Sequence, residues 1–422
     1  MKLKYGIDDS PKFGHLMLYS LQWFVLALAV VVTSLFIATG SPAERVLYAQ
    51  KVFALIGAAT IVQVLWGHRL PIIAGPASVL LVGIITTLAA QGEHTNINTI
   101  YTAILIGGAA TLLLTAGKLL ERMQRIFTPR IVVVIMMLIA FTLGTTIKNL
   151  IFPAGDEDRH IFGLWFTLLG IPAMVVAANM MRGVAKSLVV PIALIVGYIT
   201  YYAIYGGFTE VAQQFSESDG ALLLPRIEFD WSIIAAFMIC YIALIINDVS
   251  SVQSLGGMLS TPDSDKRSRR GLAVTGIFNI VAGGLGVIGP VNYSMSPGVI
   301  ASSSCASRYA LIPAGLGLII CAFVPQLIAI TSAIPSTVIG VILLYLMGTH
   351  VAASLHTLIE SGSTHSFNDC LIVGLPIMIS LIFSIIPMNI IPTLLRPIIG
   401  NGFIMGVILV MLLEHVILRQ RK

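Results

Sequence analysis

Charged residues are scarce in this chain: Asp, Glu, Lys and Arg make up only 10% of its 422 residues, whereas hydrophobic residues make up 57%. With a mean hydropathy of +0.95, this composition excludes a water-soluble globular fold. A helix needs roughly 20 mainly apolar residues to cross the hydrocarbon core of a bilayer, and stretches of that length recur along the chain. The composition therefore predicts an all-α polytopic membrane protein.

Motifs of soluble enzymes and of metal sites are also missing. No glycine-rich phosphate loop precedes a Lys-Ser or Lys-Thr pair, and no HExxH motif occurs. These absences argue against an enzyme, an ATP-driven pump, a resident cofactor and a metal site. The net charge of +5 does not indicate nucleic-acid binding, because the basic residues cluster in particular loops. The four cysteines have no CxxC spacing, so we expect small buried apolar side chains at Cys240, Cys305, Cys321 and Cys370.

The apolar stretches number about fourteen. We expect spans at 15–38, 47–66, 70–89, 98–117, 131–150, 162–181, 186–206, 232–252, 271–289, 291–306, 308–331, 335–355, 369–390 and 392–416. Lys and Arg accumulate on the cytoplasmic side of membrane proteins, and most of the 24 basic residues fall in the even-numbered connections and near the two ends. We therefore predict a multi-pass protein of the cell membrane with both termini in the cytoplasm.

Two features of the expected cytoplasmic side have simple interpretations. The densest charge cluster, at 263–270, is expected to be a solvated loop that fixes topology, and a site for lipid headgroups is the alternative. His350, His356 and His365 lie along a cytoplasmic connection at irregular intervals, and we expect them to be solvated surface residues.

Two segments rich in glycine and proline, at 70–80 and 288–300, interrupt the helical pattern. Proline removes an amide donor and clashes with the preceding helical turn, and unwound backbone at membrane depth needs protein or a watery cavity around it. The first break lies in span three and the second in the third span of a second seven-span half. Paired breaks at matching positions of inverted halves mark transporter binding sites. Two unrelated proline kinks are the alternative.

Polar groups within the spans are further candidates for a site, because they are costly in a membrane. Asn247 and Ser251, late in span eight, share a helix face, and Asp248 lies about 100° around the helix. A carboxyl group in a low-dielectric environment can bind and release a proton near neutral pH. Asp248 is therefore a candidate for proton coupling. Alternatively, it sits at the cytoplasmic end of its helix and is capped by water or Ser251.

The second break would offer an extended backbone and its polar groups from Tyr293 to Ser296. The helices that follow the two breaks would point their N-termini, which carry about half a positive charge each, at this place from opposite sides. Such a site suits a neutral or weakly anionic planar heterocycle. Gln22 in span one is a further candidate for this cavity, whereas we expect Asn279 in span nine to form an interhelical hydrogen bond.

Taken over essentially the whole chain, this pattern resembles the xanthine/uracil permeases, also called nucleobase–ascorbate transporters or type-two nucleobase–cation symporters. The similar features are Leu21-Gln22, the break Leu70-Pro71 with Gly75-Pro76-Ala77-Ser78, the start of span eight at Phe229 and Trp231, and the segment Met295–Ala301. The resemblance implies a single transporter unit over 1–422 with two inverted seven-span repeats at 15–206 and 232–416. It also implies a core domain (about 15–117 and 232–331), a gate domain (about 131–206 and 335–416), a homodimer and an elevator-type mechanism coupled to H+ or Na+.

The resemblance also implies positions for the substrate site. The glutamate that usually contacts the base corresponds to Asn247, and the histidine-bearing position four residues later corresponds to Ser251. In span ten, the usual Gln or Glu ligand corresponds to Met295 and the usual Asn to Ser296. The candidate substrate-binding residues are therefore Asn247, Ser251, Tyr293, Ser294, Met295, Ser296, Ala77, Ser78 and Gln22, and Asp248 is the candidate proton-coupling residue. Because both usual base-reading side chains are replaced, we expect backbone groups near Ser78 and Ser294 to contribute more to recognition.

These features predict a secondary active transporter for a purine, a pyrimidine or a related planar heterocycle. An anion transporter of the same seven-plus-seven architecture, resembling the sulfate permeases, is one alternative, because two facing helix N-termini suit an anion. The lack of a hydrophilic domain after the last expected span argues against it. A membrane scaffold or sensor without transport activity is the second alternative.

Overall fold

The structure is a computed structural model, and it describes residues 3–418 apart from residues 33, 39–40, 92–95, 117–127, 154–156, 182–188, 207–223, 294–295, 388–389 and 393–394. Up to residue 206 its elements are α1 (Phe13–Val32), η1 (Leu35–Ile37), α2 (Pro42–Leu65), β1 (Ala74–Pro76), α3 (Ser78–Gln91), α4 (Ile97–Thr115), α6 (Pro129–Thr142), α7 (Gly144–Ile151), α8 (Glu157–Met180) and α10 (Val189–Tyr205). After residue 223 they are α12 (Trp231–Met258), α13 (Ser264–Leu285), β2 (Pro290–Asn292), α14 (Ser296–Ser303), η3 (Arg308–Ala310), α15 (Leu311–Ala322), α16 (Pro325–Ser332), α17 (Ser336–Glu360), α18 (Phe367–Ser384), α19 (Arg396–Ile399), α20 (Gly402–Leu412) and η6 (Leu413–Ile417).

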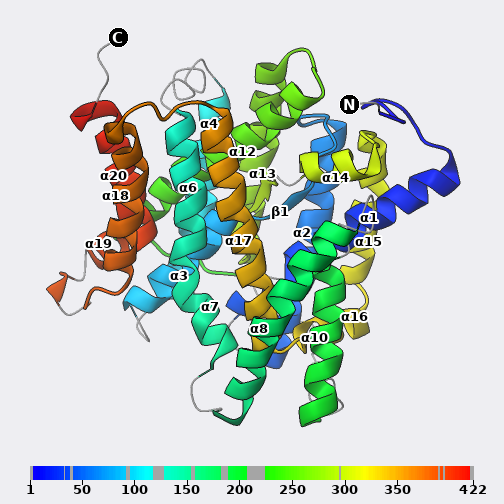
Figure 1. Cartoon of the computed structure of the whole chain (residues 1–422), viewed down its shortest axis with the longest axis horizontal. Helices are drawn as coiled ribbons and strands as arrows, with labels where there is room; N and C mark the ends of the chain where they lie inside the picture. The colour runs from blue at the N-terminus through cyan, green and yellow to red at the C-terminus, as the bar shows by residue number, and fades with distance from the viewer. Residues whose placement is uncertain are drawn as a thin grey trace.

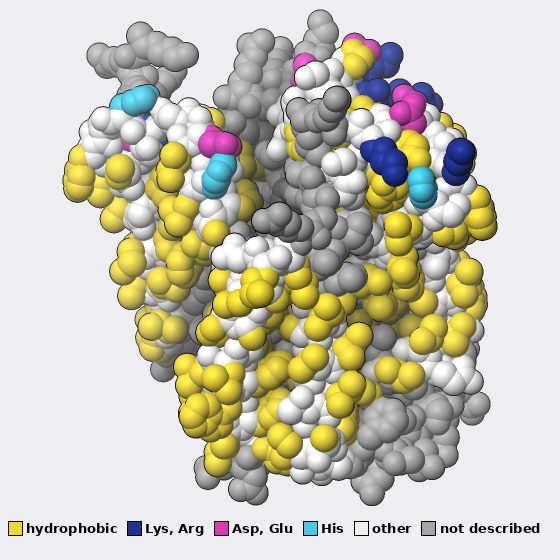
Figure 2. Space-filling model, turned by 45° about the vertical axis from the view of Figure 1, so that its right-hand side comes forward, with side chains coloured by type: hydrophobic (Ala, Val, Ile, Leu, Met, Phe, Trp, Pro, Cys, Tyr) yellow, Lys and Arg dark blue, Asp and Glu magenta, His cyan; other side chains and the backbone are white. Residues whose placement is uncertain are grey.

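The described helices have the lengths and surfaces of a membrane protein. Eight of them are long and apolar enough to span a bilayer, and four shorter apolar helices accompany them. On the face shown in Figure 2, hydrophobic side chains cover much of the described surface, whereas the charged and histidine side chains gather at one end. The N-terminal segment and the end of α20 lie at the same end of the molecule (Figure 1). The prediction of about fourteen spans stays a prediction.

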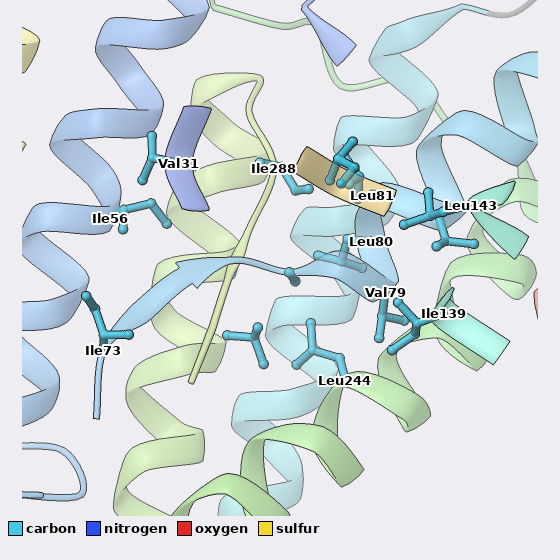
Figure 3. Close-up of a cluster of buried hydrophobic side chains, with 14 of the residues drawn as sticks. Val31, Ile56, Ile73, Val79, Leu80, Leu81, Ile139, Leu143, Leu244 and Ile288 are labelled. Carbon is cyan, nitrogen blue, oxygen red and sulfur yellow. The ribbon is translucent and has the colours of Figure 1, made fainter. Parts of the chain in front are cut away.

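The two predicted breaks are extended segments that meet inside the helical bundle, which confirms this part of the sequence analysis. β1 and β2 pair antiparallel, with Ala74 opposite Asn292 and Pro76 opposite Pro290. All three residues of each strand are buried. Apolar side chains surround the crossing from several helices, among them Val31 of α1, Ile56 of α2, Leu244 of α12 and Ile139 of α6 (Figure 3). Each strand provides hydrogen-bond partners for part of the other strand's backbone N–H and C=O groups. Such partners are needed because the surroundings are apolar.

The helices on either side of this crossing pack reciprocally. The most extensive helix contacts are those of α13 with α4 and of α15 with α2. In each pair, the second helix of one half of the chain lies along the fourth helix of the other half. Small residues permit the close approach: a Cβ on Gly283 of α13 would lie 2.5 Å from the backbone nitrogen of Leu105 of α4.

Adjacent glycines of α13 allow a matched test of this contact. Gly283→Ala should destabilise the protein by about 1–3 kcal/mol, because overpacking against backbone forces the helices apart. Gly284→Ala should not, since a Cβ there would meet no atom within 4 Å and alanine favours the helix. Thermal unfolding in detergent compares the two variants. Equal melting temperatures would contradict the close packing of α13 on α4.

The remaining helices form the other side of the molecule, where α6 packs against α17, α18 and α20. In Figure 1, α18 and α20 lie on the left and α1, α2 and α15 on the right, with α6 and α17 between them. Ion pairs connect three elements on this side: the Arg130 guanidinium of α6 binds Asp369 of α18 and, at 2.9 Å, Glu414 of η6. Both carboxylates are buried, so the pairing supplies the partner that buried charges need.

Two smaller predictions can be compared with the structure. Cys240, Cys305 and Cys321 are buried as expected, but the expectation is wrong for Cys370, which is exposed because it lies on the outer face of α18. Asn279 does form interhelical bonds: its Oδ1 accepts from the Tyr241 hydroxyl of α12 at 2.8 Å, and its Nδ2 donates to the Pro290 carbonyl at 2.9 Å.

Candidate functional site

Asp248 is held directly against the strand crossing. Its side chain is fully buried in α12. Oδ1 accepts a hydrogen bond from the backbone N–H of Asn292 in β2 at 2.8 Å, and Oδ2 accepts from the hydroxyl of Thr275 in α13 at 3.1 Å. The alternative that Asp248 is capped at a helix end is wrong, because α12 continues to Met258 and the Ser251 hydroxyl donates to the Asn247 carbonyl instead, at 2.8 Å. Asp248 thus connects α12 and α13 to the second break.

Tyr293 and Ser78 meet where the two strands end. The Tyr293 hydroxyl donates to the Pro76 carbonyl at 2.7 Å and lies 3.4 Å from Ser78 Oγ. The Tyr293 backbone N–H donates to the Ile73 carbonyl at 3.0 Å. The aromatic ring is therefore fixed by both strand segments, and it presents its face and its hydroxyl at the beginning of α3.

A cavity adjoins Tyr293 and Ser78. Its lining comes from α1 and the residues after it, β1, α3, the junction of α6 and α7, the residue after β2, and α17. It consists of Val30, Ser34, Pro76, Ser78, Leu81, Leu143, Tyr293, Leu343, Leu346, Met347 and His350. Its volume is about 20 Å³, which is little more than one water molecule needs. A planar heterocycle therefore fits only after the helices that bound the cavity have moved apart. Leu81 of α3 and Leu143, between α6 and α7, both line this cavity, and Figure 3 shows them near the strand crossing.

His350 is a candidate that the sequence analysis missed. The expectation of a solvated surface residue is wrong for it, because His350 lies within the long helix α17 and lines the cavity. Its Nδ1 is buried and has no hydrogen-bond partner among the described residues. The available signal was the helical spacing of Leu343, Met347 and His350, which places them on one face. By contrast, the side chain of His356 is 70% exposed, as expected.

The other predicted site residues lie around the crossing without lining this cavity. Ala77 and Ser296 are fully buried; the Ala77 N–H donates to the Gly289 carbonyl at 2.9 Å, and the Ser296 hydroxyl donates to the Tyr293 carbonyl at 3.1 Å. Gln22 and Ser251 are buried in α1 and α12, and Asn247 is half-buried. The predicted ligands Ser294 and Met295 lie outside the described residues. The structure thus brings together Ser78 and Tyr293, and Asp248 is connected to them only through its hydrogen bond to the backbone of Asn292, the residue before Tyr293.

No group of three or more His, Cys, Asp or Glu side chains that could hold a metal ion occurs within the described ranges. The arrangement instead offers hydroxyl groups, an aromatic ring and an imidazole, which can donate and accept hydrogen bonds. Such groups suit a planar polar ligand.

Comparison with known proteins shows similarity to permeases and to membrane transporters. The chain is 25% identical over 430 residues to a protein of Clostridium perfringens named provisionally as a purine permease, covering 99% of this chain and 93% of that protein. It is also 25% identical to the uric acid permease PucJ of Bacillus subtilis, over 72% of this chain and 69% of that protein.

Solved structures share the fold. The transmembrane domain of the cyanobacterial bicarbonate transporter BicA superimposes with a TM-score of 0.64 at 14% identity, covering 89% of this chain and 97% of that domain. Murine Solute Carrier 26 family member A9, an anion transporter in the inward-facing state, gives a TM-score of 0.61 at 14% identity, covering 95% and 68% of the two chains. The sequence model of the xanthine/uracil permeases, described as a permease family, matches residues 14–389, and this chain belongs to that family of membrane transporters, which are not enzymes.

Proposed function

We propose that this protein is a secondary active transporter of purines, with its substrate site in the cavity between the strand crossing and α17. The single observation that carries the proposal is the paired break of β1 and β2, which presents Tyr293 and Ser78 at a cavity inside a bundle of membrane-spanning length. Irregular backbone of this kind is tolerated in a membrane where it lines a site. We infer purines as the substrates because similar proteins are named as purine and uric acid permeases.

Transport requires that the cavity open, and the packing supports a division into two moving parts. The proposed core comprises about 15–117 and 232–331, and the proposed gate comprises about 131–206 and 335–416. The reciprocal pairs α13–α4 and α15–α2 lie within the core, as expected for two inverted seven-span repeats. The apolar side chains that line the cavity from both parts, Leu81 of the core and Leu143 and Leu343 of the gate, then belong to the surface along which core and gate slide in an elevator-type cycle.

Purine recognition is proposed to use groups from both parts. Ser78 and Tyr293 of the core offer hydroxyls, and the Tyr293 ring offers a stacking surface. His350 of the gate offers an imidazole nitrogen whose hydrogen-bonding capacity is unused by the described residues. A base bound between them satisfies groups on both sides, so binding favours a closed state. This contribution from the gate partly replaces the side chains that are changed at Asn247 and Met295.

Proton coupling is proposed to occur at Asp248. The carboxylate is fully buried and bonds to the backbone of Asn292, the residue immediately before Tyr293. A change in its protonation therefore alters the hydrogen bonding of the strand that carries the substrate-contacting tyrosine. Coupling to sodium is the alternative, and a homodimeric assembly with cytoplasmic termini is a further part of the proposal.

Uptake by proteoliposomes tests the proposed function. Purified protein should accumulate radiolabelled xanthine or uric acid when the outside is acidic relative to the lumen, and unlabelled purines should compete. Thermal shifts with the same purines, and with sulfate and bicarbonate, give an independent ranking, because a ligand stabilises the folded state that binds it. Stabilisation and uptake only with the inorganic anions would support the anion transporter instead. No ligand-dependent shift and no uptake would favour a scaffold or sensor.

A further inference from the structure

A set of polar side chains that includes Asp248 is buried where the end of α2 and the connection after it meet α12, α13 and β2. It consists of Gln63, His68, Asp248, Thr275 and Asn292, each no more than 2% exposed. Gln63 Nε2 donates to Thr275 Oγ1 at 3.0 Å and to the Gly271 carbonyl at 2.9 Å. Thr275 in turn donates to Asp248. Burying polar side chains inside a membrane protein costs free energy, so their presence there suggests a functional role.

The hydrogen bonds of His68 define its tautomer. Its Nδ1 accepts the backbone N–H of Leu70 at 3.0 Å, so the proton of the neutral ring lies on Nε2. Burial lowers the pKa of His68 to about 3. The guanidinium of Arg267, which donates to the His68 carbonyl at 3.1 Å, acts in the same direction. The ring is therefore neutral, and its Nε2 can only donate.

The Asn292 side chain is fully buried in the same cluster and is close enough to the His68 ring and to the Asp248 carboxylate to affect the ionisation of each. In this conformation, neither its Oδ1 nor its Nδ2 has a hydrogen-bond partner among the described residues, and the same holds for His68 Nε2. A donor from His68 favours the orientation in which Asn292 turns Oδ1 toward the ring. The amide Nδ2–H₂ group then faces Asp248.

We propose that His68 is a positioning residue for the coupling carboxylate: it fixes the orientation of the Asn292 amide and thereby adds a hydrogen-bond donor to ionised Asp248. This inference rests on the proposed function, because it concerns the residue proposed to carry the proton. Asp248 then faces three donors, namely the Asn292 N–H, the Asn292 amide group and the Thr275 hydroxyl. Each donor favours the ionised form, so this conformation is one that releases the proton.

Among the described residues, few other ionisable groups lie near the cluster, and none of them donates a hydrogen bond to Asp248 in place of the donor proposed for His68. Arg267 is held by the carbonyls of His68 and Arg69, at 3.1 and 3.0 Å. Tyr241 adjoins the cluster through Asn279, and its hydroxyl donates to Asn279 and to the Ile104 carbonyl. The hydrogen bonds of both side chains thus go to other acceptors, whereas Asn292 and Thr275 donate to the carboxylate itself.

Two conservative substitutions separate the two nitrogens of the ring. In His68→Gln, the terminal amide can reach the place of Nε2 and donate to Asn292. In His68→Asn, an oxygen can take the place of Nδ1 and accept the Leu70 N–H, but the shorter side chain does not reach Asn292. We expect the pH at which proton-driven uptake is half-maximal to rise by about one pH unit in His68→Asn, as for loss of one donor to a carboxylate. It should stay near the wild-type value in His68→Gln.

The background variant Asn292→Ala makes the test specific, because without the Asn292 amide the two His68 variants should give the same pH profile. A pH shift in His68→Asn that persists on the Asn292→Ala background would overturn the inference, as would equal profiles for His68→Gln and His68→Asn on the wild-type background.

A readout without transport keeps the two proposals distinct. The melting temperature of the detergent-solubilised protein, measured from pH 5 to 8 against Asp248→Asn, reports the titration of Asp248 through linkage. The midpoint of this difference should rise in His68→Asn and not in His68→Gln. Absence of purine uptake by the wild type would refute the proposed function while the melting curves still decide the role of His68. Unaltered melting midpoints in all His68 variants would refute that role.

Discussion

Asp248→Asn should abolish accumulation of purine against a gradient while leaving downhill exchange intact. The substitution preserves size: the new Oδ1 can accept the Asn292 N–H, and the Thr275 hydroxyl can turn to accept from Nδ2, so both hydrogen bonds of the carboxylate have replacements. The protein should therefore fold, but it can no longer bind and release a proton at this position.

The size of the effect follows from the driving force. One pH unit corresponds to about 1.4 kcal/mol, so a one-proton symporter should accumulate substrate about tenfold across a gradient of one unit. Asp248→Asn should reach only the external concentration. Proteoliposomes with an imposed gradient measure accumulation, and counterflow of labelled against unlabelled purine in the same preparation is the control. Accumulation by the variant equal to that of the wild type would show that the proton is carried elsewhere.

His350→Leu should reduce kcat/KM for purine uptake by about tenfold, as expected for the loss of about 1.4 kcal/mol of interaction. The physical reason is that the imidazole lies at the cavity with a nitrogen that no described residue engages, so the leucine leaves a polar edge of the bound base without a partner. His350→Gln should recover part of the loss, because the amide can again donate or accept.

His356→Leu is the matched control on the same helix. His356 lies about 1.7 turns further along α17. It is largely exposed and pairs with Glu360 at 3.3 Å. Its replacement should leave kcat/KM within about twofold of the wild type, since exposed pairs contribute little. Equal losses in both variants, or normal uptake by His350→Leu, would remove α17 from the substrate site.

The sequence is sufficient to predict the membrane class, the two breaks and the family, because these depend on strong local signals. Long apolar runs are typical of membrane spans. Two prolines combined with glycine, at 71–76 and at 289–298, favour a break, whereas a single proline is accommodated inside α8 and inside α18. The polar residues Asp248 and Asn279 are conspicuous for the same reason, since few alternatives exist for such groups in an apolar span.

Residues whose role depends on tertiary packing are not accessible in this way. His350 and His356 are the same residue type at nearby positions of one helix, and only the rotation of α17 relative to the strand crossing separates a cavity residue from a surface one. Likewise, Asn292 lies in a strand of three residues, and its backbone bond to Asp248 depends on a pairing of β2 with a strand from the other half of the chain. The burial of Cys370 is predicted wrongly because the sequence alone does not show which face of α18 packs against the protein and which face is exposed.

The claim that the base binds between the strand crossing and α17 is tested most directly by a cryo-EM map of the protein in nanodiscs with xanthine. The map should show ligand density in contact with Tyr293 and Ser78 on one side and His350 on the other, in a cavity enlarged relative to the closed one described here. Ligand density at another place in the bundle, with the cavity between Tyr293 and His350 still closed, would contradict it.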